Sequence, residues 1–218
     1  MIPFSVEQFL DVFGRYNTDL PYIGFAASVA ALLSAAAAFT NDRRFRPFTV
    51  LVLVFLWAWA GIVYQIGYFA EINTLAYLFG SIFVLQAFLL LYFGLLHGDL
   101  QFAFNADVSD FIGVGFILYS IVLYPMLGNL FGHNYPRTPT FGVPCPITIF
   151  TFGLLIWNKK PVTLRLLAIP LLWTIIGSTA TFLFGIWEDA PMLVAAGATI
   201  FLNAKKRRKK AGLNMIAD

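Results

Sequence analysis

Long apolar runs, separated by short clusters of polar or charged residues, follow one another along most of this chain. A straight helix needs about 20 apolar residues to cross a bilayer. Seven runs reach or approach that length, at residues 22–39, 47–70, 74–97, 111–131, 142–158, 166–187 and 190–204. The runs at 142–158 and 190–204 are short, so each could instead be a re-entrant segment. The pattern predicts an all-α polytopic membrane bundle of about seven transmembrane helices, with residues 1–204 as a single membrane domain.

The segment before the first run has a different pattern. Ser5 and Gln8 have the spacing of a capping box, which favours a helix start at this point. Apolar residues then fall on one side of the helix, at Val6, Phe9, Leu10 and Phe13. Residues 5–16 are therefore predicted to form an amphipathic helix that lies along the membrane surface.

The composition agrees with a membrane protein. Hydrophobic residues make up 60% of the chain and charged residues only 11%, whereas soluble domains carry about 25% charged residues. The excess of apolar side chains must face lipid rather than water. The single cysteine excludes an intrachain disulfide scaffold.

The placement of basic residues predicts the orientation. Twelve of the 14 Lys and Arg residues follow the first, fifth and seventh runs, and cytoplasmic loops are the ones that collect such residues. The N-terminus is therefore predicted to lie outside, and residues 205–218 to form a basic cytoplasmic tail. In that tail we expect an anchor for anionic lipids rather than nucleic acid, formed by Lys205, Lys206, Arg207, Arg208, Lys209 and Lys210.

Several kinds of chemistry find no support in the sequence. The middles of the predicted spans contain no Asp, Glu, Lys, Arg or His, whereas proton relays and ion-coupled pumps usually carry one there. Phosphate-binding glycine loops and paired-cysteine metal motifs are absent from the sequence as well. The sequence therefore identifies no cofactor.

The loop at 132–146, GHNYPRTPTFGVPCP, combines rigidity with reactive side chains. It holds four of the 11 prolines, which restrict its backbone. It also holds His133, Tyr135 and the only thiol, Cys145. Pro146 fits the first position of the next helix, which predicts Cys145 as its N-cap. Two interpretations stay open: a shielded structural thiol, or a reactive or metal-binding thiol paired with His133.

Further polar side chains are expected at the same depth, near the outer ends of the spans. Together with the loop they predict an outward-facing pocket, lined by His133, Tyr135, Cys145, Tyr64, Gln65, Tyr68, Glu71, Tyr124 and Glu188. The alternative for each residue taken alone is an aromatic belt at the interface or a helix cap.

The same loop carries a resemblance to a known family. The stretches GHNYPRTPTFGVPCPITIFTFGLL, PFSVEQFLDVFGRYN, WAWAGIVYQIGYFAEINTLAYLFGSIFVLQ and IPLLWTIIGSTATFLFGIWED resemble a family of small bacterial multi-pass membrane proteins known as domain of unknown function 6064. The resemblance runs to about residue 200. It implies a bacterial inner-membrane protein, and it supplies no catalytic residue.

Three classes of function remain open. The first is a non-enzymatic protein that binds or transports a small molecule or ion through an outward-facing pocket under the 132–146 loop. The second is an accessory or structural subunit of a membrane complex, or a homo-oligomer. The third is a thiol- or metal-dependent membrane enzyme centred on Cys145 and His133.

Overall fold

Helices make up most of the computed structural model, which describes residues 3–217. The helices are α1 (Val6–Asp19), α2 (Ile23–Phe39), α3 (Arg46–Trp59), α4 (Ala76–Leu89), α5 (Val108–Leu118), α6 (Tyr124–Leu130), α7 (Pro144–Ile156), α8 (Leu164–Phe184) and α9 (Ala190–Ala217). The described residues form two isolated β-bridges and no strand. The all-α expectation is therefore confirmed.

Among the described residues, three of the long helical stretches, which we call rods, continue beyond an α-helix through a π-helical segment. These segments are η2 (Ala60–Tyr68) after α3, η4 (Leu90–Leu96) after α4, and η5 (Tyr119–Leu123) between α5 and α6. A short 3-10 turn, η3 (Phe69–Glu71), completes the first of these rods. Gly61 of η2 and Gly80 of α4 let two rods touch through their backbones, since a Cβ at either glycine would lie within 2.7 Å of the other's carbonyl oxygen.

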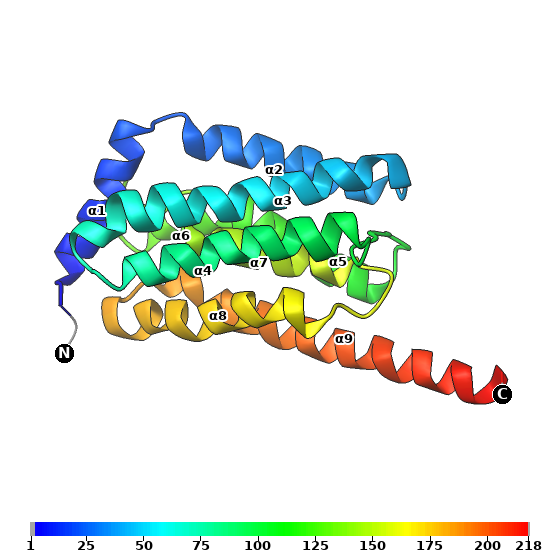
Figure 1. The fold of residues 1–218 in the computed structure, drawn as a ribbon. Helices are drawn as coiled ribbons and strands as arrows, with labels where there is room; N and C mark the ends of the chain where they lie inside the picture. The colour runs from blue at the N-terminus through cyan, green and yellow to red at the C-terminus, as the bar shows by residue number, and fades with distance from the viewer. Residues whose placement is uncertain (1–2, 218) are drawn as a thin grey trace.

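The rods run side by side, and α1 crosses one end of the bundle (Figure 1). α1 has the expected capping box, with Ser5 and Gln8 each bonded to the other's backbone N–H. The chain then bends by 82° between α1 and α2. The helix itself is thus confirmed, and its position on a membrane surface stays a prediction.

Helix α7 is the centre of the bundle. Every residue of α7 except Cys145 is buried, and α3, α5, α8 and α9 all pack against it. Its 13 residues rise about 20 Å, less than the thickness of the bilayer core. The segment after η4 fills the space beyond its C-terminus, where Ala103 N–H donates to Trp157 O and Lys159 N–H donates to Gln101 O, both at 2.8 Å.

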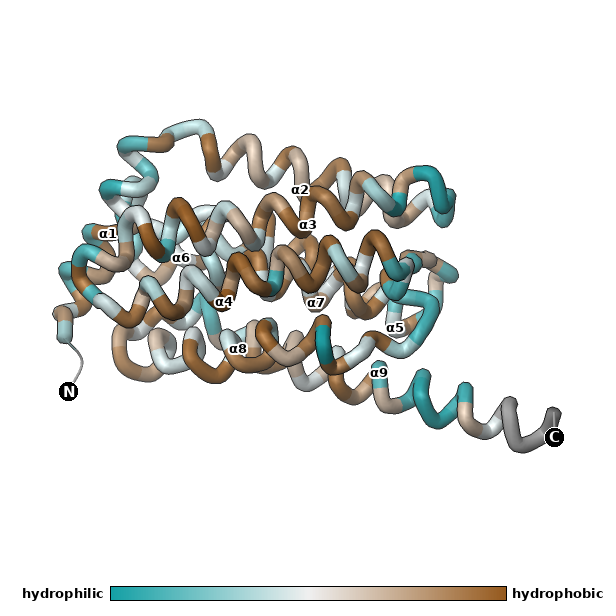
Figure 2. Tube along the Cα trace, in the orientation of Figure 1, coloured by the Kyte–Doolittle hydropathy of each residue, from teal (hydrophilic) through white to brown (hydrophobic). Residues whose placement is uncertain are grey.

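Within residues 3–217, four helical stretches are long and apolar enough to cross a membrane: Arg43–Glu71, Ala76–Leu96, Val108–Leu130 and Leu164–Phe184. The bent pair α1–α2 would make a fifth. Apolar residues cover the middle of the bundle and hydrophilic residues its ends (Figure 2). Large apolar side chains on the flanks are exposed, for example Phe25 at 74% and Ile175 at 69%. The structure is thus compatible with a membrane protein, and the count of seven spans stays a prediction.

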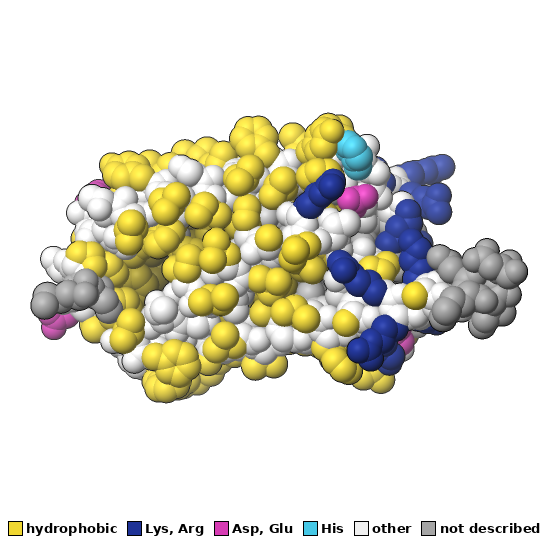
Figure 3. All heavy atoms as spheres, turned by 60° about the horizontal axis from the view of Figure 1, so that its bottom comes forward, with side chains coloured by type: hydrophobic (Ala, Val, Ile, Leu, Met, Phe, Trp, Pro, Cys, Tyr) yellow, Lys and Arg dark blue, Asp and Glu magenta, His cyan; other side chains and the backbone are white. Residues whose placement is uncertain are grey.

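Basic side chains gather at the end where α9 leaves the bundle (Figure 3). The residues expected to form a tail continue α9 as one helix to Ala217. Lys206 Nζ donates to Ile156 O at 2.7 Å and to Asn158 O at 2.6 Å, and Arg207 donates to Val162 O at 3.0 Å. Burial lowers the pKa of Lys206. Two of the six residues expected to anchor lipid therefore also bind backbone carbonyls.

Candidate functional site

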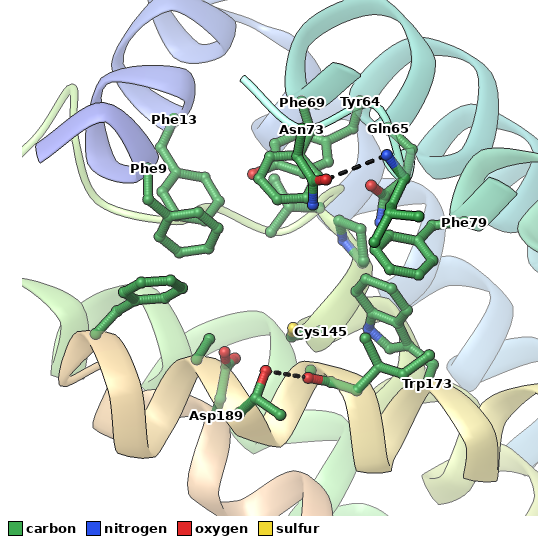
Figure 4. A pocket seen from close by; sticks show the side chains of 18 of the residues that line it. Phe9, Phe13, Tyr64, Gln65, Phe69, Asn73, Phe79, Cys145, Trp173 and Asp189 are labelled. Carbon is green, nitrogen blue, oxygen red and sulfur yellow. Dashed lines mark hydrogen bonds between the residues drawn. The ribbon is translucent and has the colours of Figure 1, made fainter. Parts of the chain in front are cut away.

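A cavity of about 340 Å³ lies at the end of the bundle that α1 covers (Figure 4). Its walls come from α1, η2, η3 and the starts of α4 and α7, together with the last turns of α8. Among the described residues, nine of the 22 that line the cavity are aromatic: Phe4, Phe9, Phe13, Tyr64, Phe69, Phe79, Tyr124, Trp173 and Phe184. The volume falls at the lower end of the range for small-ligand pockets, about 300–1,000 Å³.

Helix α1 closes the cavity through its aromatic face. The ring of Phe9 stacks on Phe184 of α8 with centroids 5.0 Å apart, and Phe13 stacks on Tyr64 at 5.7 Å. Trp59, the last residue of α3, also holds α1, because its Nε1 donates to Tyr16 Oη at 2.9 Å. The apolar face of α1, expected to lie on lipid, thus packs on protein in this structure.

The 132–146 loop does not form the cover that the sequence suggested. It packs against α1 through Asn17, whose Nδ2 donates to Pro136 O at 2.6 Å and to Thr138 O at 2.8 Å. Val143, Pro144 and Cys145, at the end of this loop and the start of α7, contribute to the cavity wall. The pocket is therefore covered by α1, and the loop supports α1.

Several polar atoms of the cavity wall lack a hydrogen-bond partner among the described residues. These atoms are Tyr64 Oη, both amide atoms of Gln65 and Trp173 Nε1. These side chains are only 3%, 1% and 8% exposed, in that order. A buried polar group without a partner costs about 1–3 kcal/mol. The folded protein therefore retains polar groups in the cavity that a bound molecule would satisfy.

Asp189 is the acidic residue of the cavity. It lies in the short turn η6 (Trp187–Asp189) between α8 and α9, is 2% exposed, and accepts a hydrogen bond from Tyr124 Oη. Burial, which disfavours the charged carboxylate, raises the pKa of Asp189 to about 7. The Cys145 thiol lies beside the same carboxylate. Burial therefore favours the protonated form of Asp189 over a wider pH range than for an exposed aspartate.

The structure corrects the position of Cys145. The N-cap of α7 is Val143 and Pro144 occupies the first turn, so Cys145 lies inside the helix rather than at its cap. Either proline satisfies the sequence rule for a helix start, and the chain uses the earlier one. The helix directs the thiol into the cavity, as Figure 4 shows.

His133 has a partner other than Cys145. Its Nδ1 lies 3.0 Å from Glu188 Oε1, and the Glu188 side chain is fully buried. No hydrogen bond joins His133 to Cys145 in the part of the chain that the structure describes. Residues 3–217 also contain no group of three or more His, Cys, Asp or Glu residues placed to hold a metal ion. The structure therefore pairs His133 with Glu188 rather than with Cys145.

The nine predicted pocket residues separate into two groups. Tyr64, Gln65, Tyr124 and Cys145 line the cavity. The other five lie outside its lining. Tyr68 donates to Asp19 at 3.2 Å, Glu71 pairs with Arg15, Tyr135 donates to Asn17 O at 3.3 Å, and His133 pairs with Glu188.

Sequence reasoning missed Asp189, Trp173 and the phenylalanines of the cavity. Asp189 is next to a predicted residue, Glu188, and follows a tight turn at Gly185, which has a φ of +71°. Trp173 lies within an apolar run where nothing separates a cavity-facing side from a lipid-facing one. The apolar face of residues 5–16 was the one usable signal, and it indicated lipid equally well.

Comparisons with known proteins place the chain by family. No curated protein and no solved structure matches it. A family model matches residues 6–214, nearly the whole length, which confirms the resemblance noted in the loop and the flanking stretches. The chain therefore belongs to the family of unknown function DUF6064.

Proposed function

We propose that this chain is a multi-pass protein of the bacterial inner membrane that binds a small amphipathic molecule in the cavity covered by α1. In this proposal the α1 end faces outward and the basic end faces the cytoplasm. The gathering of Lys and Arg at the opposite end supports that orientation, because cytoplasmic ends retain basic residues (Figure 3).

The unpartnered polar atoms of Tyr64, Gln65 and Trp173 carry the proposal. Buried polar groups in folded proteins are nearly always hydrogen-bonded, and here three such residues line one cavity. The surrounding aromatic rings offer a large apolar contact area. Convergent polar groups on an apolar wall are the usual anatomy of a small-molecule site.

The arrangement favours binding over covalent chemistry. His133 pairs with Glu188, so no imidazole lies beside Cys145, and the Asp189 carboxyl next to the thiol opposes the negative charge of a thiolate. A nucleophilic thiol needs a base or a positive charge close by. Assembly with membrane partners or with a second copy stays a separate prediction.

Recovery of the bound molecule tests the proposal. The protein is extracted into lipid nanodiscs and analysed by native mass spectrometry and by organic extraction. Wild type is expected to carry a small molecule in stoichiometric amount. Ala180→Phe, which fills the cavity from α8, is expected to lose it.

Ala168→Phe is the matched control, because Ala168 lies on the same helix with its side chain exposed. It is expected to retain the molecule at the level of wild type. Equal occupancy in wild type and Ala180→Phe would contradict the proposal, and so would recovery of no molecule from wild type.

A further inference from the structure

The charge of the cavity wall limits the molecules that can bind there. Among the described residues its lining contains no Lys, Arg or His, and Asp189 is acidic. An anionic head, such as a carboxylate or a phosphate, would be buried with no positive group to compensate its charge. It would also lie close to Asp189, so the two groups could not both be ionised without strong repulsion.

The unpartnered atoms limit the head group further. Trp173 Nε1 is a donor only, Gln65 offers both donors and an acceptor, and Tyr64 Oη can do either. An ammonium head has donors alone and would leave the Trp173 and Gln65 N–H groups unpaired. A hydroxyl or carbonyl oxygen accepts from these groups, and a hydroxyl can also donate to Gln65 Oε1.

Asp189, the natural partner of a cationic head, is already engaged. Tyr124 Oη donates to its carboxylate, and Cys145 lies next to it. A cation would therefore compete with a hydrogen bond that the protein itself makes. The wall is suited to an uncharged head.

The rim of the cavity faces the flank of the bundle. Leu75 at the start of α4 and Leu183 near the end of α8 line the cavity and are 56% and 55% exposed. α8 is one of the helices long and apolar enough to cross a membrane. In a bilayer this rim would contact acyl chains, and a cavity of about 340 Å³ holds a head group with only the first part of a long chain.

Resting on the proposed function, we infer that the cavity selects an uncharged amphiphile from the bilayer. Its hydroxyl or carbonyl head binds at Gln65 and Trp173, and its alkyl tail leaves between α4 and α8 past Leu75 and Leu183.

Photo-crosslinking in vesicles of neutral lipid tests this inference. Three probes share one long alkyl chain and differ in the head, which is an alcohol, a carboxylate or a trimethylammonium group. Each probe is made in two forms, with a diazirine either next to the head or at the end of the tail. The alcohol is expected to label peptides of α4 and α8 at least tenfold more than either charged probe. A diazirine next to the head should label near Trp173, and one at the end of the tail near Leu183.

Two glutamine variants supply the matched comparison. Gln65→Leu is expected to lower labelling by the alcohol at least fivefold. Gln86→Leu removes an equally buried amide from α4, outside the cavity lining, where its Nε2 donates to Leu166 O at 3.1 Å. That variant is expected to be labelled like wild type. Equal loss in both variants would overturn the placement of the head.

The remaining outcomes separate the two proposals. Equal labelling by all three heads would leave the cavity a ligand site and overturn its selection of uncharged molecules. Labelling of the cavity by none of them would contradict the proposed function itself. A short-chain alcohol supplied from water that labels as strongly as the long-chain probe would overturn entry from the bilayer.

Discussion

Two buried side-chain amides, one at each end of this bundle, differ in their hydrogen bonding. At the basic end, Asn158 accepts from Gln101 N–H at 2.5 Å and donates to Asp99 O and Lys160 O. At the α1 end, the amide of Gln65 has no partner although it is equally buried. Protein groups satisfy the first amide completely and leave the second free. The comparison teaches that the chain itself satisfies the Asn158 amide, whereas the Gln65 amide keeps hydrogen-bonding capacity that the proposed ligand would use. We call the end with Asn158 the closed end and the end with Gln65 the open end.

The first prediction tests the closed end. Asn158→Leu leaves a backbone N–H and two carbonyls without partners at the C-terminus of the central helix α7. Because each buried unpaired group costs about 1–3 kcal/mol, we expect a loss of about 4 kcal/mol in the free energy of unfolding. Thermal unfolding in detergent micelles measures it. A loss below about 1 kcal/mol would show that water replaces this network.

The second prediction concerns Asp189 at the open end. Its pKa is raised from 3.8 to about 7 in the folded protein, so the stability due to its protonated form is full below about pH 4. That stability is lost as the pH rises toward 7. Asp189→Asn removes the dependence. At pH 8 we expect the variant to be about 2 kcal/mol more stable than wild type, with water in the cavity screening part of the shift.

Glu188, Tyr124 and Cys145 lie close to Asp189 in both the variant and wild type. The measured quantity is therefore the difference between variant and wild type at each pH, in which their shared contributions cancel. Unfolding at pH 4 is the internal control, where the two proteins should be equally stable. A difference that stays constant from pH 4 to 8 would contradict the raised pKa.

The helices, the basic end and part of the cavity lining could be predicted from the sequence. Helical segments follow from apolar runs, and the basic end follows from where Lys and Arg interrupt them. Tyr64, Gln65, Tyr124 and Cys145 were found because polar residues near the ends of apolar helices are conspicuous. Those rules act on the local sequence alone.

The cover of the cavity could not be predicted, because an amphipathic helix has the same pattern whether its apolar face meets lipid or protein. Phe9 and Phe13 therefore gave no indication of Phe184 and Tyr64 as their partners. The central position of α7 is another such case. A helix that is apolar on all sides can lie in lipid or inside protein, and only the packing of the other rods decides.

The smallest predicted effect concerns two tryptophans, of which one has a hydrogen-bond partner and the other has none in the described part of the chain. Trp57 Nε1 donates to Thr151 Oγ1 at 2.9 Å inside the bundle, whereas Trp173 Nε1 has no partner. Trp57→Phe should lower the free energy of unfolding of the ligand-free protein by about 1 kcal/mol more than Trp173→Phe, because only the first removes a hydrogen bond that is made. With the cavity occupied, the order is expected to change, since Trp173→Phe then loses a bond to the ligand. Thermal unfolding of both variants, with and without the long-chain alcohol, measures this. If added alcohol raised the melting temperature of Trp173→Phe as much as that of Trp57→Phe, the free N–H would have no part in binding.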